Sequence, residues 1–216
     1  MPEACRLCAS QDCHLLFEQA KPPRREYLHC RGCDMVWVPE QFLISPRLER
    51  ERYLQHNNDP RDEGYRRFLS RLLDEIASRT PTGAEGLDYG SGPTPVLTGM
   101  LQQAGFVMRK YDLYFHRDES ALDRAYDFIA CCETAEHFRN PRAELDGLDA
   151  MLSPGGLLGI MTGMLEDWGE FERWHYRRDD THISFYAPRT MQWIARKYGW
   201  GVELPRPNVA IFRKPC

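Results

Sequence analysis

The sequence predicts an α/β protein with a mostly parallel central sheet and a small N-terminal metal-binding module. Three features support this fold. A short apolar run ends in a glycine-rich turn at residues 86–92, segments of strand and helix character alternate after it, and two cysteine pairs lie near the N-terminus. The 216 residues suffice for one α/β domain and a small module. A net charge of −4 argues against a general electrostatic attraction to nucleic acid.

We expect a cytoplasmic protein without membrane contact. No apolar run approaches the length of a membrane span, and the opening residues do not resemble a secretory signal peptide. Five of the eight cysteines fall within the first 33 residues. Paired cysteines in a chain without an export signal favour metal binding over disulfides.

The N-terminal module, residues 1–40, is expected to be a zinc ribbon. Each C-x2-C pair can place two thiolates on one turn, and two such pairs complete a tetrahedral site. Gly32 suits the tight turn of the second pair. Four thiolates leave no position for water, so the zinc would be structural. Redox pairs are the less favoured interpretation. The predicted ligands are Cys5, Cys8, Cys30 and Cys33, with Cys13 in reserve.

Residues 41–80 are expected to form a helical connector that packs on the core. A short charged helix starts at Pro46 with Ser45 as its cap. A second helix is predicted to start with Asp59 as its cap and to end at Pro81. Its apolar residues recur at helical spacing, so one face should dock on the sheet.

The first strand and turn of the main domain lie at residues 86–92. Gly90 and Gly92 can adopt positive φ and leave room for a ligand to touch the backbone, and Asp88 sits at the strand end. A plain surface turn is the alternative. Thr94 and Pro95 are expected to cap the helix that follows.

The second strand is predicted to end at Asp112, about twenty residues after the turn. An acidic residue at this place commonly hydrogen-bonds the ribose of an adenosine cofactor. Residues 113–125 are too few for a complete unit of helix and strand, so we expect the third strand to be weak or abbreviated.

The clearest buried strand is Tyr126–Cys132. Glu133, Glu136 and His137 follow it, and strand ends at this edge of such sheets hold the active site. A helix from Pro141, a strand over residues 157–162, a helix from Pro188 and a closing hairpin over residues 200–212 complete the domain.

Together, the turn at 86–92, the strand beginning Tyr-Asp-Phe-Ile with its Glu-His sequel, and the Leu-Ser-Pro-Gly-Gly turn at 152–156 resemble class I S-adenosylmethionine-dependent methyltransferases. The likeness covers roughly residues 83–212. With the ribbon in front, the chain resembles bacterial methyltransferases that carry an N-terminal zinc-binding segment. It implies a Rossmann-like domain over residues 81–216 with an antiparallel last strand. Thr94 departs from the usual third glycine, and the short third strand departs from the usual adenine contacts.

The resemblance implies a set of residues that bind S-adenosylmethionine. Asp88 and the turn backbone would hold the methionine end, Asp112 the ribose, and Tyr89 would shield the sulfonium. The complete predicted set is Asp88, Tyr89, Gly90, Gly92, Asp112 and Glu133.

The acceptor is expected at the loop of residues 171–186, which is dense in His, Trp, Tyr, Arg and Asp. Trp174 and Tyr176 are predicted to face it. A neutral imidazole suits a base near pH 7, and His182 is the first choice, followed by His137 or His175.

Three functions compete on these residues. A small-molecule methyltransferase is favoured by the acidic charge and the aromatic loop. An RNA methyltransferase would use Lys21, Arg24 and Arg25 of the ribbon as contacts. A catalytically inactive scaffold would keep only the fold. A nicotinamide-dependent oxidoreductase is disfavoured because Pro95 occupies the last glycine position of G-x-G-x-x-G.

Overall fold

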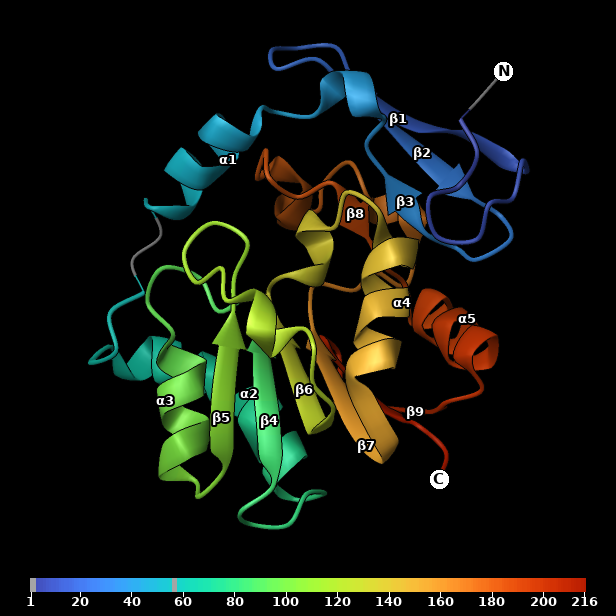
Figure 1. Cartoon of the computed structure of the whole chain (residues 1–216). Coiled ribbons are helices and arrows are strands. Elements are labelled where there is room, and N and C mark those ends of the chain that lie inside the picture. The colour runs from blue at the N-terminus through green and yellow to red at the C-terminus, as the bar shows by residue number, and fades with distance from the viewer. Residues whose placement is uncertain (1–2, 56–57) are drawn as a thin grey trace.

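A six-stranded sheet forms the centre of the computed structural model, which describes residues 3–55 and 58–216 (Figure 1). Its order is β5 (Val107–Tyr111), β4 (Glu85–Tyr89), β6 (Tyr126–Cys132), β7 (Leu152–Met161), β10 (Val209–Arg213) and β9 (Gly201–Arg206). The first four strands are parallel, and β10 runs antiparallel to both of its neighbours. The predicted α/β sheet with an antiparallel last strand is confirmed.

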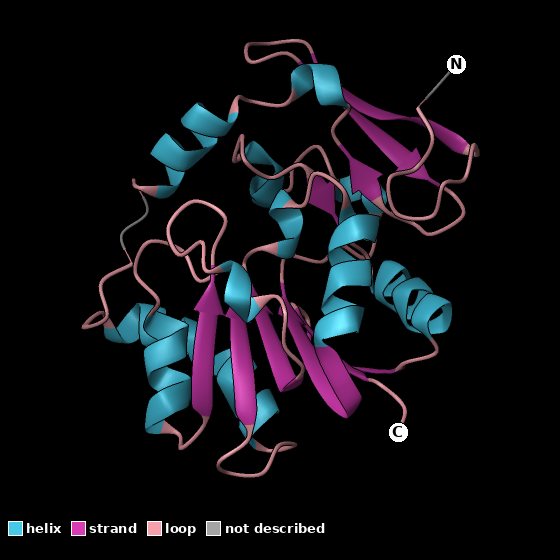
Figure 2. Ribbon diagram, viewed as in Figure 1, coloured by secondary structure: helices cyan, strands magenta, loops and turns pink. Residues whose placement is uncertain are grey.

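Two pairs of helices cover the two faces of this sheet (Figure 2). The strand β6 shows why, because successive side chains point to opposite faces. Phe128 and Ala130 pack with α2 (Glu63–Ala77) and α3 (Val96–Gln103), whereas Ile129 and Cys131 pack with α4 (Pro141–Met151) and α5 (Pro188–Tyr198). The unbroken apolar run of this strand is thus explained by burial on both sides.

The start of α2 differs from the sequence expectation. Asp62 caps it, accepting hydrogen bonds from the backbone N–H groups of Gly64 and Tyr65. Asp59 accepts from the backbone of Arg61 instead. Both aspartates precede the apolar stripe, and the pattern could not separate two possible caps three residues apart. The stripe itself docks on the sheet as predicted, through Leu69, Leu72 and Ile76.

The start of α3 is also different. No side chain caps it, so the prediction of Thr94 as a cap is wrong. Between β5 and β6 the described chain has no strand, only the short 3-10 helix Glu119–Ala121. This confirms the abbreviated third strand, and β5 is consequently an edge of the sheet.

A second sheet contains the N-terminal segment. Its order is β1 (Cys13–Gln19), β2 (Arg25–Cys30), β3 (Val36–Trp37) and β8 (Ser184–Phe185). The last of these strands comes from the loop after β7, so a distant part of the chain completes the sheet. One buried cluster joins Cys33 and Trp37 to Ile129 and Leu145 of the main domain. The small sheet is therefore packed into the molecule.

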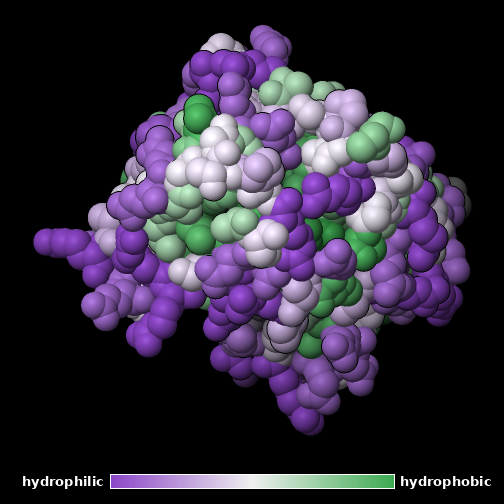
Figure 3. Space-filling view, turned by 90° about the horizontal axis from the view of Figure 1, so that it is seen from below, coloured by the Kyte–Doolittle hydropathy of each residue, from purple (hydrophilic) through white to green (hydrophobic). Residues whose placement is uncertain are grey.

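The first part of the connector, which contains α1, lies over the carboxyl end of the main sheet. After the 3-10 helix Glu40–Phe42, α1 (Pro46–Tyr53) begins with the predicted cap Ser45. Figure 1 shows α1 between the ribbon and the loops above β5. Seen from below, polar and hydrophobic residues are interspersed on the surface (Figure 3). Within residues 3–55 and 58–216, every helix is too short or too polar to cross a bilayer.

Candidate active site and metal centre

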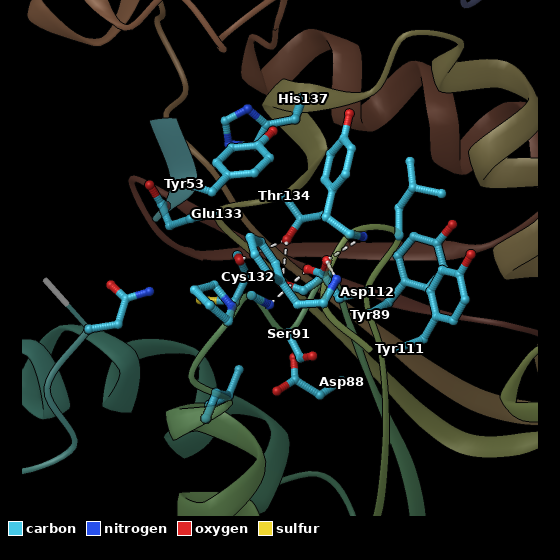
Figure 4. Close-up of a pocket in the computed structure, with 18 of the residues that line it drawn as sticks. Tyr53, Asp88, Tyr89, Ser91, Tyr111, Asp112, Cys132, Glu133, Thr134 and His137 are labelled. Atoms are coloured by element: carbon cyan, nitrogen blue, oxygen red, sulfur yellow. Dashed lines mark hydrogen bonds between the residues drawn. The ribbon is translucent and has the colours of Figure 1, made fainter. Parts of the chain in front are cut away.

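A cavity of about 410 Å³ opens at the carboxyl ends of β4, β5 and β6. The glycine turn, the residues after β5 and the residues after β6 form its walls, α1 contributes from above, and α2 contributes from the face of the sheet that it covers. Parallel α/β sheets place their ligand sites at this edge. Asp88, Tyr89, Gly90, Gly92, Asp112 and Glu133, the six predicted cofactor residues, all line the cavity (Figure 4).

The glycine turn exposes backbone to the cavity. Gly90 and Gly92 have φ values of 82° and 66°. A Cβ on Gly90 would lie 2.2 Å from the Thr134 side chain. A Cβ on Gly92 would meet no described atom closer than 3.9 Å apart from those of its two chain neighbours, and the buried Ser91 hydroxyl has no partner among the described residues. This open backbone and unsatisfied hydroxyl fit the polar end of a ligand.

Asp88 lies beneath the turn and is only 2% exposed. Its Oδ2 accepts a hydrogen bond from the Thr98 hydroxyl at 2.6 Å. Burial raises its pKa to about 6, although the Thr98 bond opposes this shift. A nearby cationic group would favour the ionised form.

Asp112 ties the turn to the loop after β5. Its Oδ2 accepts from the Gly92 N–H at 2.8 Å, and its Oδ1 accepts from the N–H groups of Tyr114 and Phe115 at 2.9 and 3.0 Å. A carboxylate offers about four acceptor positions, so about one remains for a ligand hydroxyl.

Tyr89 presents its ring to the cavity rather than its hydroxyl. The hydroxyl donates to Oε2 of Glu144 on α4 at 2.5 Å, and the ring stacks on Tyr111 with centroids 5.6 Å apart. Burial raises the pKa of this tyrosine, so it stays protonated. The ring is the part that a cofactor would meet.

Two glutamates stand at the end of β6. Glu133 has a φ of 46°, which is rare for a residue with a side chain, and its N–H donates to the carbonyl of Met161. Burial raises its pKa to about 9, and the charge of Glu136 adds to the shift. Glu136 is fully buried and accepts from the Thr162 hydroxyl at 2.8 Å and the Tyr176 hydroxyl at 2.5 Å.

His137 and His182 face the same end of the cavity. Their Nδ1 atoms lie 2.9 Å from the carbonyl of Thr181 and 2.7 Å from that of Tyr176. A carbonyl can only accept, so each Nδ1 carries a proton, and in the neutral form of either ring the lone pair is on Nε2. Burial lowers the pKa of His182, which keeps it neutral near pH 7.

The other predicted residues of the acceptor loop lie outside the cavity lining. His175 is exposed, and we no longer consider it as a base. Trp174 packs against Tyr176 and Phe185, with ring centroids 5.1 and 5.9 Å apart. Tyr176 reaches the site indirectly through its hydroxyl. The many aromatic residues in this stretch therefore pack within the loop. Of residues 171–186, His182 alone lines the cavity.

No sequence pattern indicated the role of α1 at the cavity. Its Glu49 is 6% exposed and accepts hydrogen bonds from the hydroxyls of Tyr53 and Tyr114 and from Arg139, at 2.8, 3.0 and 2.8 Å. The Tyr53 ring meets that of His137 edge-on, with centroids 5.1 Å apart. The helix looked like a solvated surface segment because five of its eight residues are charged.

The four predicted zinc ligands come together in the ribbon. The sulfurs of Cys5, Cys8, Cys30 and Cys33 all lie within 4.8 Å of one another, and two of the pairs are 3.5 and 3.4 Å apart. Sulfurs bound to tetrahedral zinc would be about 3.8 Å apart. The donor set therefore fits zinc.

Both cysteine pairs have the same turn. The N–H of Ala9 donates to the carbonyl of Cys5, and that of Asp34 donates to the carbonyl of Cys30, each at 2.8 Å. Ala9 and Asp34 have φ values of 60° and 64°. The left-handed residue thus follows each pair, while Gly32 suits the tight turn because a Cβ there would lie 3.3 Å from the Ser10 side chain.

Arg25 is buried beneath the acceptor loop. It is 1% exposed and donates to the backbone carbonyls of Asp180 and His182. The prediction that it contacts RNA is therefore wrong, since it supports the chain around His182. Arg24 is exposed and pairs with Glu18 at 3.0 Å.

Comparisons with known proteins agree with this geometry. Residues 61–204 match the family described as "Methyltransferase domain". Over 93 residues the chain is 30% identical to a ubiquinone biosynthesis O-methyltransferase of Shewanella pealeana, which is 42% of this chain but only 39% of that enzyme.

Solved structures share the fold at low identity. Magnesium protoporphyrin IX methyltransferase from Synechocystis PCC 6803, with bound S-adenosylhomocysteine, is 14% identical, with a TM-score of 0.54 over 79% of this chain and 95% of that one. A 1,6-didemethyltoxoflavin N1-methyltransferase from Burkholderia thailandensis is 14% identical, with a TM-score of 0.53 over 92% and 99%. The family match spans two thirds of the sequence and includes every element that builds the cavity except α1. The chain belongs to the methyltransferase domain family.

Proposed function

We propose that the protein is an S-adenosylmethionine-dependent methyltransferase that acts on a small-molecule acceptor. One observation carries the proposal: a single cavity joins the glycine turn and Asp112 to a group of glutamate and histidine side chains. The named relatives with small-molecule substrates support the acceptor class. The buried Arg25 weakens the case for RNA.

The turn end of the cavity would hold the cofactor. The Ser91 hydroxyl and the open backbone at Gly92 would bind its polar amino-acid part, Asp88 would offset its positive charge, and Asp112 would accept from a ribose hydroxyl. The ring of Tyr89 would cover one side. When bound, this cofactor supplies a methyl group activated by the positive charge on sulfur.

The acceptor would bind beside Glu133, His137 and His182. Their positions allow one acceptor atom to be held in line with the methyl group while the surrounding side chains exclude water. The acceptor atom forms a bond to the methyl carbon, the bond from carbon to sulfur breaks with its electron pair on sulfur, and the acceptor's proton goes to Nε2 of a neutral histidine. His182 is our first choice, because burial favours its neutral form.

We further propose that the four ribbon cysteines bind one structural zinc ion. The two identical turns hold four sulfurs at the right separation, and no open position would remain for a reactant. The zinc ion would then stabilise the ribbon, which packs against the main domain.

Calorimetry with S-adenosylmethionine tests the cofactor assignment. We expect saturable one-to-one binding, and at least tenfold weaker binding for Asp112→Asn. Asp118→Asn is the matched control, because Asp118 is exposed and outside the cavity. Absence of binding at millimolar cofactor would leave only a non-catalytic scaffold.

A panel of small hydroxylated and amino compounds, assayed for release of S-adenosylhomocysteine, tests the acceptor class. Transfer to RNA alone, with a salt-sensitive RNA shift, would contradict it. His182→Ala should lower turnover on a true acceptor at least a hundredfold, and normal turnover would remove its proposed role.

A further inference from the structure

We propose that Glu136, His137 and His182 form a binding site for a divalent transition-metal ion at the acceptor end of the cavity. This site is separate from the four cysteines of the ribbon. What the ion does for the acceptor rests on the proposed methyl transfer, whereas its binding does not.

The three ligand atoms already converge. One nitrogen from each histidine and one oxygen of Glu136 all lie within 4.8 Å of one another. Some point is therefore no more than about 2.8 Å from all three, and bonds from zinc to nitrogen or oxygen are about 2.0–2.2 Å long. Movements of less than an ångström would close the site.

Hydrogen bonds orient each ligand for a metal. Both histidines donate Nδ1–H to backbone carbonyls, which leaves Nε2 as the nitrogen of each ring that a metal could bind. The Glu136 carboxylate accepts from the hydroxyls of Thr162 and Tyr176. Protein metal sites hold their ligands through outer contacts of this kind.

The two chain segments that carry the ligands are firmly joined. The N–H of Ile183 donates to the carbonyl of Glu136 at 2.8 Å, and the Ser184 hydroxyl donates to the carbonyl of Phe138 at 2.8 Å. The Arg25 guanidinium donates a hydrogen bond to the backbone carbonyl of His182. The ligand geometry is thus set before any ion arrives.

The electrostatics of the site call for a cation. Glu136 is fully buried, and Glu133 stands beside it. Among residues 3–55 and 58–216, neither glutamate forms an ion pair with Lys or Arg, and Glu136 has only His137 at 3.9 Å. The two Nε2 atoms likewise have no donor among these residues. A divalent cation would offset the buried charge of Glu136 and would use the Nε2 lone pairs of the two histidines.

Two imidazoles and one carboxylate favour a first-row transition metal over Mg²⁺, which prefers oxygen ligands. Three protein ligands leave coordination positions for an acceptor oxygen, with Glu133 close by. An acceptor hydroxyl bound to the ion would lose its proton more readily. With its lone pair on the metal, His182 could not also take that proton, and Glu133, whose pKa is raised to about 9, already carries one near pH 7. In the metal-bound site the acceptor proton would pass to a solvent water molecule, and this would replace the base role proposed above for His182.

Titration of the full-length, zinc-loaded protein with Mn²⁺, followed by electron paramagnetic resonance, tests the site. Mn²⁺ prefers nitrogen and oxygen ligands to thiolates, so the ribbon should not contribute. We expect one bound equivalent, at least tenfold weaker binding in Glu136→Gln and His182→Gln, and roughly 10–100-fold weaker binding in Thr162→Val. His175→Gln, an exposed histidine on the same loop, should bind as the wild type does.

Absence of Mn²⁺ binding at millimolar concentration, together with no zinc beyond the ribbon's one equivalent, would overturn the proposal. Unchanged binding in both ligand variants would do the same.

Calorimetry with S-adenosylmethionine shows whether the variants fold. If they do not, paramagnetic broadening of histidine resonances in the wild type decides: loss of the His137 and His182 signals supports the site, and loss of only other histidines refutes it. A protein that binds the metal but not the cofactor would contradict the proposed function alone.

Discussion

Asp88 illustrates how one buried carboxylate in the lining of a cavity can lower the stability of the fold. It is buried beneath the glycine turn, with one hydroxyl as its hydrogen-bond donor. Its pKa of about 6 in the folded protein exceeds the ordinary value of 3.8. The folded state therefore binds the proton more tightly than the unfolded state, and stability falls as the pH rises from about 4 to about 6.

Asp88→Asn should stabilise the ligand-free protein above pH 6 by roughly 1–3 kcal/mol, because the cost of burying the charge disappears. At pH 4 the variant and the wild type should be alike. Urea unfolding at both pH values measures this. The same variant should bind S-adenosylmethionine at least tenfold more weakly, and equal loss of stability at both pH values would contradict the argument.

Gly90→Ala should reduce cofactor binding at least tenfold and destabilise the fold by roughly 1–3 kcal/mol. The new Cβ would overlap the Thr134 side chain, and φ of 82° is unfavourable for alanine. Gly99→Ala is the matched control. Gly99 lies within α3, and a Cβ there would meet no described atom within 4 Å, so this variant should raise the free energy of unfolding by about 0.5–1 kcal/mol. Calorimetry and thermal melting measure both.

At the scale of elements, α1 is held over the cavity by one buried carboxylate. Glu49 gathers Tyr53 of its own helix, Tyr114 of the loop after β5, and Arg139. Three segments that are far apart in sequence are thereby fixed around the acceptor end. The helix shields His137 through the ring of Tyr53.

Glu49→Ala should loosen α1, because three donors lose their shared acceptor. We expect faster proteolysis within residues 46–53 and cofactor binding several-fold weaker. Glu51→Ala on the same helix is the control, since Glu51 is exposed and pairs only with Arg47 among the described residues. If both variants are cleaved at the wild-type rate, Glu49 does not hold the helix.

The elements that sequence predicted well are those fixed by local patterns. Gly90, Asp112 and the paired cysteines act through spacing along the chain, and their positions agree with expectation. The cap of α2 was mispredicted because Asp62, three residues after Asp59, offers the competing hydrogen bonds, and the predicted cap of α3 is wrong because no side chain caps that helix. His137 and His182 were each candidates, but their meeting with Glu136 depends on contacts across more than forty residues. The burial of Arg25 and Glu49 depends on the same long-range packing, which no local pattern encodes.

At the scale of the whole molecule, the ribbon and the main domain share one core and one sheet. The pairing of β3 with β8 and the cluster that includes both Cys33 and Leu145 cross the division expected at residue 40. The three expected parts therefore follow one another along the chain, but the ribbon and the main domain are not packed as independent folding units.

Cys30→Ser should remove the zinc and lower the melting temperature of the whole chain in a single transition. The lost ligand destabilises the ribbon, and the shared sheet carries this to residues 181–185. Zinc analysis and calorimetric melting measure both effects. Cys13→Ser should change neither, because its sulfur lies outside the four-cysteine group. A separate early transition confined to the ribbon would contradict the coupling.

The backbone of Ile183 connects the cavity to the ribbon. Its N–H bonds to Glu136 at the cavity, while its carbonyl accepts from the N–H of Val38 in the ribbon at 2.9 Å. One peptide segment thus belongs to both regions, so a zinc ion in the ribbon and a ligand in the cavity would each favour the same arrangement of this segment. Because such coupling is reciprocal, whatever affinity the ribbon's zinc adds to ligands in the cavity, those ligands add equally to the affinity for zinc. Acceptor chemistry and zinc retention would then vary together with the supply of either ligand.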